Sequence, residues 1–273
     1  MPSGPCWERG SIGWTTGGDW PRPRPDRPPQ RSGPRAWARA PRGRRTGLHS
    51  HHEPAQHGHG GDGHGHQGHS DHGHGGSHGN PEDLDAYIAR LEDPARDEWQ
   101  RPDAVVAALG LRRGQTVGEI GGGPGYWSLR LARKLGAAGC VYAVDVEPRL
   151  LEVLRQRLEE RKVGNVTPVL GLPEDPLLPV ASCDLVLLVN AYHHLPDGPA
   201  YLRRLARALR RGGRIVNVDF HKRETPVGPP VEERVSREEF LAGARRAGLV
   251  PVAEHGFLPH QYCVALRPRR APR

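Results

Sequence analysis

The feature that most constrains the fold is a glycine-rich turn between an apolar strand and an amphipathic helix. It lies in the segment Val117–Tyr126, which reads VGEIGGGPGY, and an acidic residue, Asp145, ends the next apolar segment. Glycines let the backbone turn sharply and approach a ligand that any side chain would block. A strand, turn and helix of this kind predict a site for a nucleoside-type cofactor.

Strands and helices alternate along the rest of the chain, and this order predicts the architecture. The expected strands are 116–120, 140–144, 166–170, 184–189, 214–219, 249–254 and 261–266, and the expected helices are 80–91, 102–110, 126–135, 148–161, 198–210 and 237–247. Repeated strand–helix units form a mostly parallel, doubly wound α/β sheet with helices on both faces. Only residues 256–259 separate the last two strands, so they should pair antiparallel.

The N-terminal part has a different composition. Residues 1–48 are rich in Arg and Pro, have no hydrophobic period and are expected to be a disordered tail. They carry +7 of the net charge of +8, so the remainder has no basic footprint and no nucleic-acid partner is expected. The only Met is residue 1, which suggests the hypothesis that this tail is not translated and that translation starts near Leu48.

Residues 49–79 form a His- and Gly-rich low-complexity segment that holds eleven of the sixteen histidines. Neutral imidazoles bind Zn²⁺ or Ni²⁺, although the tract lacks the fixed spacing of a rigid site. The alternative is a solvated tail without a chemical role. The candidate ligands for a non-catalytic metal are His57, His59, His64, His66, His69, His72 and His74.

The four cysteines lie far apart with no CxxC spacing, which predicts a reducing compartment and no disulfide framework. No apolar run reaches the length of a membrane span, and the N-terminus lacks the apolar stretch of a secretory signal. We therefore expect a cytoplasmic protein with no membrane partner.

The residues around the glycine turn narrow the choice of cofactor. A dinucleotide fingerprint needs a small residue at position 126, where Tyr126 stands. The spacing instead reads acid-x-G-x-G-x-G from Glu119 to Gly125. An acid beside the turn can accept from an ammonium group, directly or through water, and Asp145 can take both hydroxyls of a ribose. A cofactor with an amino-acid end and no pyrophosphate suits this pattern.

These segments resemble the motifs of class I S-adenosylmethionine-dependent methyltransferases. Further matching segments follow in order at 170–175, 182–190, 193–195 and 209–214, so the resemblance covers about residues 95–268. It implies a seven-stranded sheet with a reversed last strand and transfer of a methyl group from a sulfonium. Residues 80–110 would then be N-terminal helices that form a lid, and 111–273 the methyltransferase domain.

The resemblance also implies the cofactor-binding residues. They are Glu119, Gly121, Gly123, Gly125, Asp145, Glu174, Asp175 and Asn190. The family often has an acid for the adenine amino group where this chain has Leu172, so Glu174 or Asp175 is expected to take that role.

Methyl transfer is an in-line displacement, in which alignment supplies most of the catalysis and a base is needed only for a protonated acceptor. The candidate catalytic residues follow the fourth and fifth strands and are His193, Asp219 and Tyr192, with His194 and His221 nearby. For each of them a packing or capping role is an alternative. Trp99 either shields the reaction site or anchors the N-terminal helices.

The sequence leaves the methyl acceptor open. A small molecule is the first hypothesis, because no nucleic-acid- or protein-binding module is evident, and the pattern is nearest to quinone-biosynthesis-like methyltransferases. A second hypothesis is a metal-handling or sensor protein that uses the His-rich tract on a methyltransferase-like scaffold. A third, disfavoured by Tyr126, is an NAD-dependent oxidoreductase. The oligomeric state is not indicated.

Overall fold

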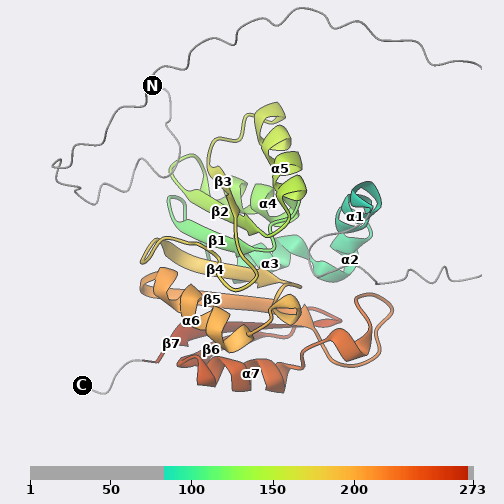
Figure 1. The fold of residues 1–273 in the computed structure, drawn as a ribbon, viewed down its shortest axis with the longest axis vertical. Helices are drawn as coiled ribbons and strands as arrows, with labels where there is room; N and C mark the ends of the chain where they lie inside the picture. Colours follow the sequence, from blue (N-terminus) through green and yellow to red (C-terminus); the bar gives the residue numbers. More distant parts are fainter. Residues whose placement is uncertain (1–82, 270–273) are drawn as a thin grey trace, which may run out of the picture. The chain divides into compact units, whose positions relative to one another are not determined.

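The computed structural model describes residues 83–269, in which strands and helices alternate as the sequence predicts (Figure 1). The elements are α1 (Leu84–Leu91), α2 (Arg96–Gln100), α3 (Pro102–Ala108), β1 (Thr116–Ile120), α4 (Tyr126–Leu135), β2 (Cys140–Asp145), α5 (Pro148–Glu160), β3 (Val166–Leu170), β4 (Cys183–Val189), the 3₁₀ helix η2 (Tyr192–His194), α6 (Gly198–Ala208), β5 (Leu209–Phe220), the 3₁₀ helix η3 (Val231–Glu233), α7 (Arg237–Arg246), β6 (Leu249–His255) and β7 (Gln261–Pro268).

The strands form one seven-stranded sheet in the order β3-β2-β1-β4-β5-β7-β6. β1 to β5 pair in parallel, whereas β7 runs antiparallel to both β5 and β6. This confirms the predicted doubly wound sheet with a reversed last strand. Because β1 and β4 are parallel neighbours, the loops that follow them lie at the same carboxyl edge. Chain order changes direction between these two strands, which is where ligands bind in such sheets.

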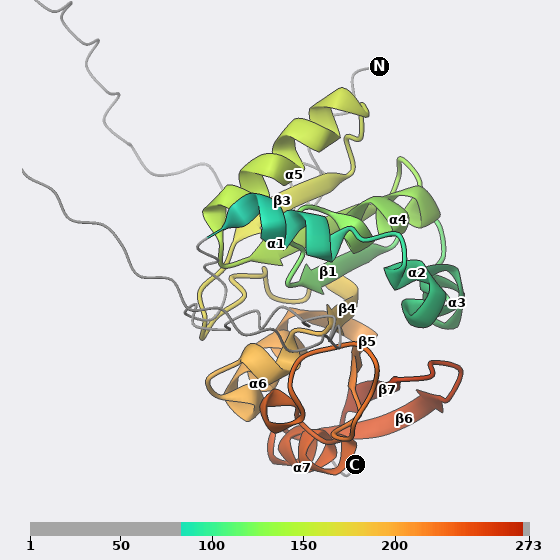
Figure 2. The ribbon, with the colours of Figure 1, turned by 90° about the vertical axis from the view of Figure 1, so that its right-hand side faces the viewer.

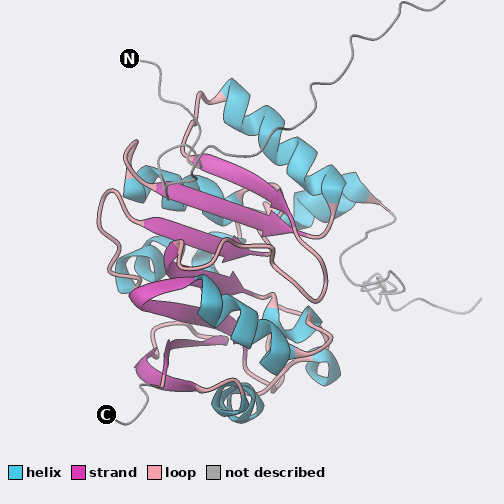
Figure 3. Cartoon of the chain, turned by 60° about the vertical axis from the view of Figure 1, so that its left-hand side comes forward, coloured by secondary structure: helices cyan, strands magenta, loops and turns pink. Residues whose placement is uncertain are grey.

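Helices cover both faces of the sheet (Figure 3). The apolar sides of α3, α4 and α5 pack on one face and those of α6 and α7 on the other. Strand β4 shows how one segment serves both layers: Leu185 and Leu187 point into the first core, while Val186 and Leu188 point into the second. This continuous apolar run is the pattern of a parallel strand that is buried on both faces.

The largest differences from the predicted elements lie at the start of α1, at α2 and at the junction of α6 and β5. α1 begins at Leu84 with Asp83 as its N-cap, whose carboxylate accepts from Ala86 N at 2.9 Å, so the predicted start of this helix at residue 80 is wrong. α2 was not predicted at all. The helix expected to reach Arg210 ends at Ala208, and β5 begins at once at Leu209 rather than at Arg214.

Three further local features follow from the structure. Ser236 and Glu239 form a capping box at the start of α7. Cys140, Cys183 and Cys263 are buried. No helix between residues 83 and 269 is both long and apolar enough to cross a bilayer.

Candidate active site

The glycine turn after β1 is pinned to the end of β2. Gly121 N and Gly122 N both donate to Val144 O at 2.9 Å, and Gly123 N donates to Asp145 Oδ2 at 2.7 Å. Gly123 has φ 51° and Gly125, the N-cap of α4, has φ 103°, both in the left-handed region that L-residues avoid. The turn therefore depends on glycine, and it brings bare backbone to the carboxyl edge of the sheet.

Asp145 is fixed at this edge as predicted. Its Oδ1 accepts from Glu147 N at 3.0 Å, while its Oδ2 accepts from Gly123. Burial raises the pKa of Asp145 above its usual range, and these backbone donors oppose the shift. Each carboxylate oxygen has a second lone pair, so the group can hold the turn and still accept from two ribose hydroxyls.

Glu119 lies on β1 beneath the turn and is 2% exposed. Its Oε2 accepts from Ser128 Oγ at 2.5 Å, and its Oε1 has no hydrogen-bond partner within the described part of the chain. Burial raises its pKa to about 8. A buried carboxylate oxygen without a partner is costly, and an ammonium donor would satisfy it. These residues fit the amino-acid end and the ribose of S-adenosylmethionine.

The N-terminal helices lie over the turn. The side chain of Leu91, the last residue of α1, comes within 3.5 Å of the position that a Cβ on Gly123 would take. Glu92 forms an ion pair with Arg157 of α5, which also donates to Pro124 O at 2.9 Å. Figure 2 looks onto the carboxyl edge and shows α1 lying across it.

Tyr126 joins α2 to α4. Its ring lies against two guanidinium groups, those of Arg96 at 4.1 Å and Arg130 at 4.0 Å, and its hydroxyl donates to Asp97. Arg130 also pairs with Asp97 at 3.0 Å. The side chain that excludes a dinucleotide fingerprint therefore serves as an anchor for the N-terminal helices.

The predicted adenine side of the site lies on the loops after β2 and β3. Asp175 pairs with Arg204 of α6 at 2.7 Å, and its Oδ1 also accepts from Leu177 N. Glu174 is exposed. Val146 and Leu172, which follow β2 and β3, are 37% and 50% exposed apolar side chains at the same edge. The adenine contact of either acid stays a prediction.

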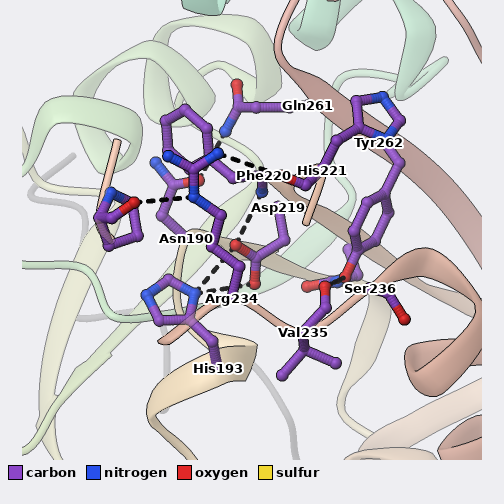
Figure 4. Close-up of polar contacts among 12 residues, drawn as sticks. Asn190, His193, Asp219, Phe220, His221, Arg234, Val235, Ser236, Gln261 and Tyr262 are labelled. Atoms are coloured by element: carbon purple, nitrogen blue, oxygen red, sulfur yellow. Dashed lines mark hydrogen bonds and ion pairs between the residues drawn. The ribbon is translucent and has the colours of Figure 1, made fainter. Parts of the chain in front are cut away.

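His193 and Asp219 form a buried pair at the ends of β4 and β5 (Figure 4). His193 Nδ1 lies 2.9 and 3.0 Å from the two oxygens of Asp219, and the side chains are 3% and 1% exposed. Phe220 N also donates to Asp219 Oδ1 at 2.9 Å. Because a carboxylate only accepts, Nδ1 of His193 carries the hydrogen, and Nε2 of a neutral ring keeps its lone pair.

Tyr192 is not brought to this pair. Its ring packs edge-on against Phe240 at 4.8 Å, and its hydroxyl lies where a Cβ on Gly198 or Gly243 would stand, between α6 and α7. Burial raises its pKa to about 12. These contacts indicate a packing role for Tyr192 in the core rather than the predicted catalytic role.

The remaining candidates from the sequence, Trp99, His194 and His221, contact aromatic rings near the buried pair. The ring of Trp99 lies 5.4 Å from that of Phe220, so α2 contacts the end of β5. His194 is exposed with its ring 4.1 Å from that of His193, and His221 packs against Tyr262 at 5.9 Å.

Two buried polar residues, Gln261 and Arg234, were not predicted from the sequence. Gln261 Nε2 donates at 2.5 Å to Oδ1 of Asn190, a predicted cofactor residue with φ 53°. Arg234 is 4% exposed and donates to carbonyl groups of the loop before it, among them Arg223 O at 2.6 Å and Pro229 O at 2.8 Å. A glutamine and an arginine far apart in sequence carry no motif, so no local signal could have identified them.

Metal ligation finds no support in the described residues. Between positions 83 and 269 no three His, Cys, Asp or Glu side chains gather closely enough to hold an ion. The candidate ligands from His57 to His74 lie outside the described residues.

Comparison with known proteins agrees with this fold and with the residues at its carboxyl edge. Residues 117–213 match the family described as a methyltransferase domain. The topology, the acid before the glycine turn and the acid ending β2 agree with that match. In the part that the structure describes, the chain is similar to class I S-adenosylmethionine-dependent methyltransferases.

Individual relatives agree with this assignment. The chain is 36% identical to aklanonic acid methyltransferase DauC of Streptomyces sp. (strain C5), over 55% of this chain and 62% of that protein. It is 30% identical to the ubiquinone/menaquinone biosynthesis C-methyltransferase UbiE of Idiomarina loihiensis, over 45% of this chain and 49% of that protein. The chain thus spans about half to three fifths of the length of these curated relatives.

A solved structure extends the similarity over the whole domain. A SAM dependent methyltransferase from Aquifex aeolicus aligns with a TM-score of 0.64 and 26% identity, covering 68% of this chain and 98% of that chain.

Proposed function

We propose that this protein transfers the methyl group of S-adenosylmethionine to a small-molecule acceptor that gives up a proton to His193. The observation that carries the proposal is the meeting of two sets of groups at one sheet edge. The glycine turn with Glu119 and Asp145 follows β1 and β2, and the His193–Asp219 pair follows β4 and β5. The groups proposed to bind the methyl donor and the proposed base thus lie on neighbouring loops.

The chain's own residues would orient the methyl donor and handle the proton. Glu119 and Asp145 hold the amino-acid end and the ribose, and the sulfonium of the bound donor supplies an electrophilic methyl group. Asp219 keeps the ring of His193 in the tautomer whose Nε2 accepts a proton and stabilises the imidazolium that results. Trp99 and the N-terminal helices cover the edge and exclude water.

Calorimetry with S-adenosylhomocysteine tests the donor site. We expect binding by the wild type, and Asp145→Ala should weaken it by about 1–3 kcal/mol, because the ribose hydroxyls lose a charged acceptor. Absence of binding at millimolar ligand would refute the proposal. Glu159→Gln, a change of an exposed residue of α5, serves as the surface control.

The metal-handling alternative concerns residues outside the described region and receives no support from the residues within it. An NAD-dependent reaction is disfavoured by the position of Tyr126, whose ring is engaged by Arg96 and Arg130. A fluorescence titration with NADH separates this alternative from the methyl-donor proposal.

A further inference from the structure

Three side-chain amides and one guanidinium form a continuous chain of hydrogen bonds across the carboxyl edge. Arg96 Nε donates to Gln100 Oε1, Gln100 Nε2 donates to Gln261 Oε1 at 3.4 Å, and Gln261 Nε2 donates to Asn190 Oδ1 at 2.5 Å. Gln100 is 0% and Gln261 1% exposed. We call this series of hydrogen bonds the amide relay. It links α2 to the start of β7 and to the end of β4.

The amide relay has a fixed direction. A guanidinium has only donors, so Gln100 must turn its oxygen towards Arg96 and its NH₂ towards Gln261. The same constraint passes to Gln261 and then to Asn190, whose oxygen is used by the last bond. Reversing any amide would set two NH₂ groups or two oxygens against each other in a buried place. Arg96 thereby determines which atom Asn190 leaves free.

The free atom is the Nδ2 donor of Asn190. This residue is half-buried, and none of the described residues accepts a hydrogen bond from its Nδ2. Asn190 follows β4, with its backbone N donating to Val218 O at 2.9 Å, directly before Asp219. Figure 4 shows Asn190, His193 and Asp219 close together. The donor of Asn190 and the histidine of the buried pair thus both follow β4, three residues apart in sequence, at the carboxyl edge of the sheet.

We infer that Asn190 donates to an acceptor oxygen that becomes negatively charged when His193 removes its proton. The inference rests on the proposed function and narrows its substrate class to molecules whose conjugate base is an oxyanion: phenols, enols and 1,3-dicarbonyl carbon acids. Asn190 is then a specificity-determining residue, and Gln100 and Gln261 are positioning residues that act through it.

The step balances without another reactant. His193 Nε2 takes the proton from the O–H or the acidic C–H group. The electron pair left on oxygen, or on the carbon conjugated to it, forms the new bond to the methyl carbon. The electrons of the broken methyl–sulfur bond stay on sulfur, which becomes a neutral thioether. Asn190 Nδ2 stabilises the oxyanion before attack, in the way of a preorganised donor.

The test uses the full chain saturated with S-adenosylhomocysteine and two isosteric probes, 4-nitrophenol and 4-nitroaniline. We expect the wild type to bind 4-nitrophenol at least about tenfold more tightly, the value of one good hydrogen bond to a charged group. We also expect the pKa of the bound phenol, followed by its phenolate absorbance, to fall. Asn190→Asp keeps the contact with Gln261 but removes the donor, so it should raise that pKa and abolish the preference.

Gln261→Met tests the amide relay itself, because it leaves Asn190 in place with its amide free to turn. We expect the preference for 4-nitrophenol to fall between those of the wild type and Asn190→Asp. Gln115→Met is the matched control: its Oε1 accepts from Arg112 N at 2.8 Å at the opposite edge of the sheet, so the preference should stay unchanged.

The outcomes separate the two proposals. No binding of S-adenosylhomocysteine would refute the proposed function. Normal binding of S-adenosylhomocysteine with no preference for 4-nitrophenol, including no binding of either probe, would overturn the inference alone. A preference that Gln261→Met leaves intact would overturn the positioning role of the amide relay.

Discussion

Two buried ionisable residues of opposite charge, Glu119 and Arg234, differ in whether their polar atoms have partners. Among the described residues, Glu119 is a buried acid with one oxygen unpartnered, whereas Arg234 is a buried cation that donates to carbonyl groups and to no carboxylate. Both are expensive to bury, because each loses hydration that its neighbours replace only in part. The unpartnered acid therefore points to a cationic ligand, and the satisfied cation points to a structural role.

The raised pKa of Glu119 predicts a pH dependence of ligand binding. The carboxyl group is protonated below about pH 8 in the free protein and must ionise to pair with an ammonium group. Binding then releases one proton, so the Kd for S-adenosylhomocysteine should fall about tenfold per pH unit between pH 6 and 8. Calorimetry in buffers of different ionisation enthalpy measures both the slope and the proton.

Glu119→Gln should remove that slope, and Glu159→Gln should retain it. A wild-type affinity that is flat from pH 6 to 8 would contradict the pairing. The sign for stability is opposite: the folded pKa lies above the ordinary value of 4.5, so the ligand-free domain should lose stability as pH rises from 4.5 to about 8.

At the scale of elements, α2 is a five-residue helix whose position depends on the side chains it offers to others. Arg96 contacts Tyr126 and donates to Leu91 O at 2.6 Å, and Trp99 contacts Phe220. Isolated helices of this length are unstable in water, so tertiary contacts must hold α2 in place.

Tyr126→Leu should therefore release α2 selectively. It removes the ring between two guanidinium groups, an interaction of about 0.5–2 kcal/mol for each cation. Tyr126→Phe keeps the ring and loses only the hydroxyl bond to Asp97. Hydrogen exchange should show faster exchange of α2 amides in the Leu variant than in the Phe variant, with the core strands unchanged. Equal protection of α2 in both variants would argue against the anchor.

Arg234 predicts a similar effect on the loop between β5 and α7. It donates to Pro229 O, Arg223 O and Thr225 Oγ1 within 2.8 Å, so its planar fork ties the loop into a ring. Arg234→Lys should lose most of these bonds, and trypsin should cut after Lys222 at least about tenfold faster, since each bond contributes about 1.5–3 kcal/mol.

Arg237→Lys is the matched control for that loop, because Arg237 pairs with Glu254 outside the ring, at the end of β6. Its cleavage rate at Lys222 should equal that of the wild type. Unchanged cleavage in Arg234→Lys would show that the loop is held by other contacts.

The elements also show which parts of the fold sequence reasoning can reach. Strand β4 and helix α4 were predicted because hydrophobic periodicity is local. α2 was missed because five residues show no period, and the start of β5 was misplaced because Gly212-Gly213 reads as a turn although Leu209 already pairs with Cys183. The turn with Glu119 and Asp145 was predictable from spacing, whereas Gln100 and Gln261 meet only through the folded sheet.

At the scale of the whole molecule, every group of the candidate active site belongs to residues 83–269. Both cores and the sheet also lie there. None of the residues on which donor binding is proposed to depend belongs to the His-rich segment 49–79. Methyl-donor binding and any metal binding should therefore be separable in one chain.

Deletion of residues 49–79 tests this separation. Saturation with S-adenosylhomocysteine at about 100 times its Kd should stabilise the native state by about 2.7 kcal/mol, which raises the Tm by roughly 5–10 °C for a domain of this size. Thermal unfolding should show the same increase in the full chain and the deletion variant. Calorimetry with Ni²⁺ should detect binding only in the full chain, if the tract is a metal ligand. Loss of the Tm increase on deletion would mean that the His-rich segment takes part in the donor site, contrary to the arrangement of Glu119, Gly123 and Asp145.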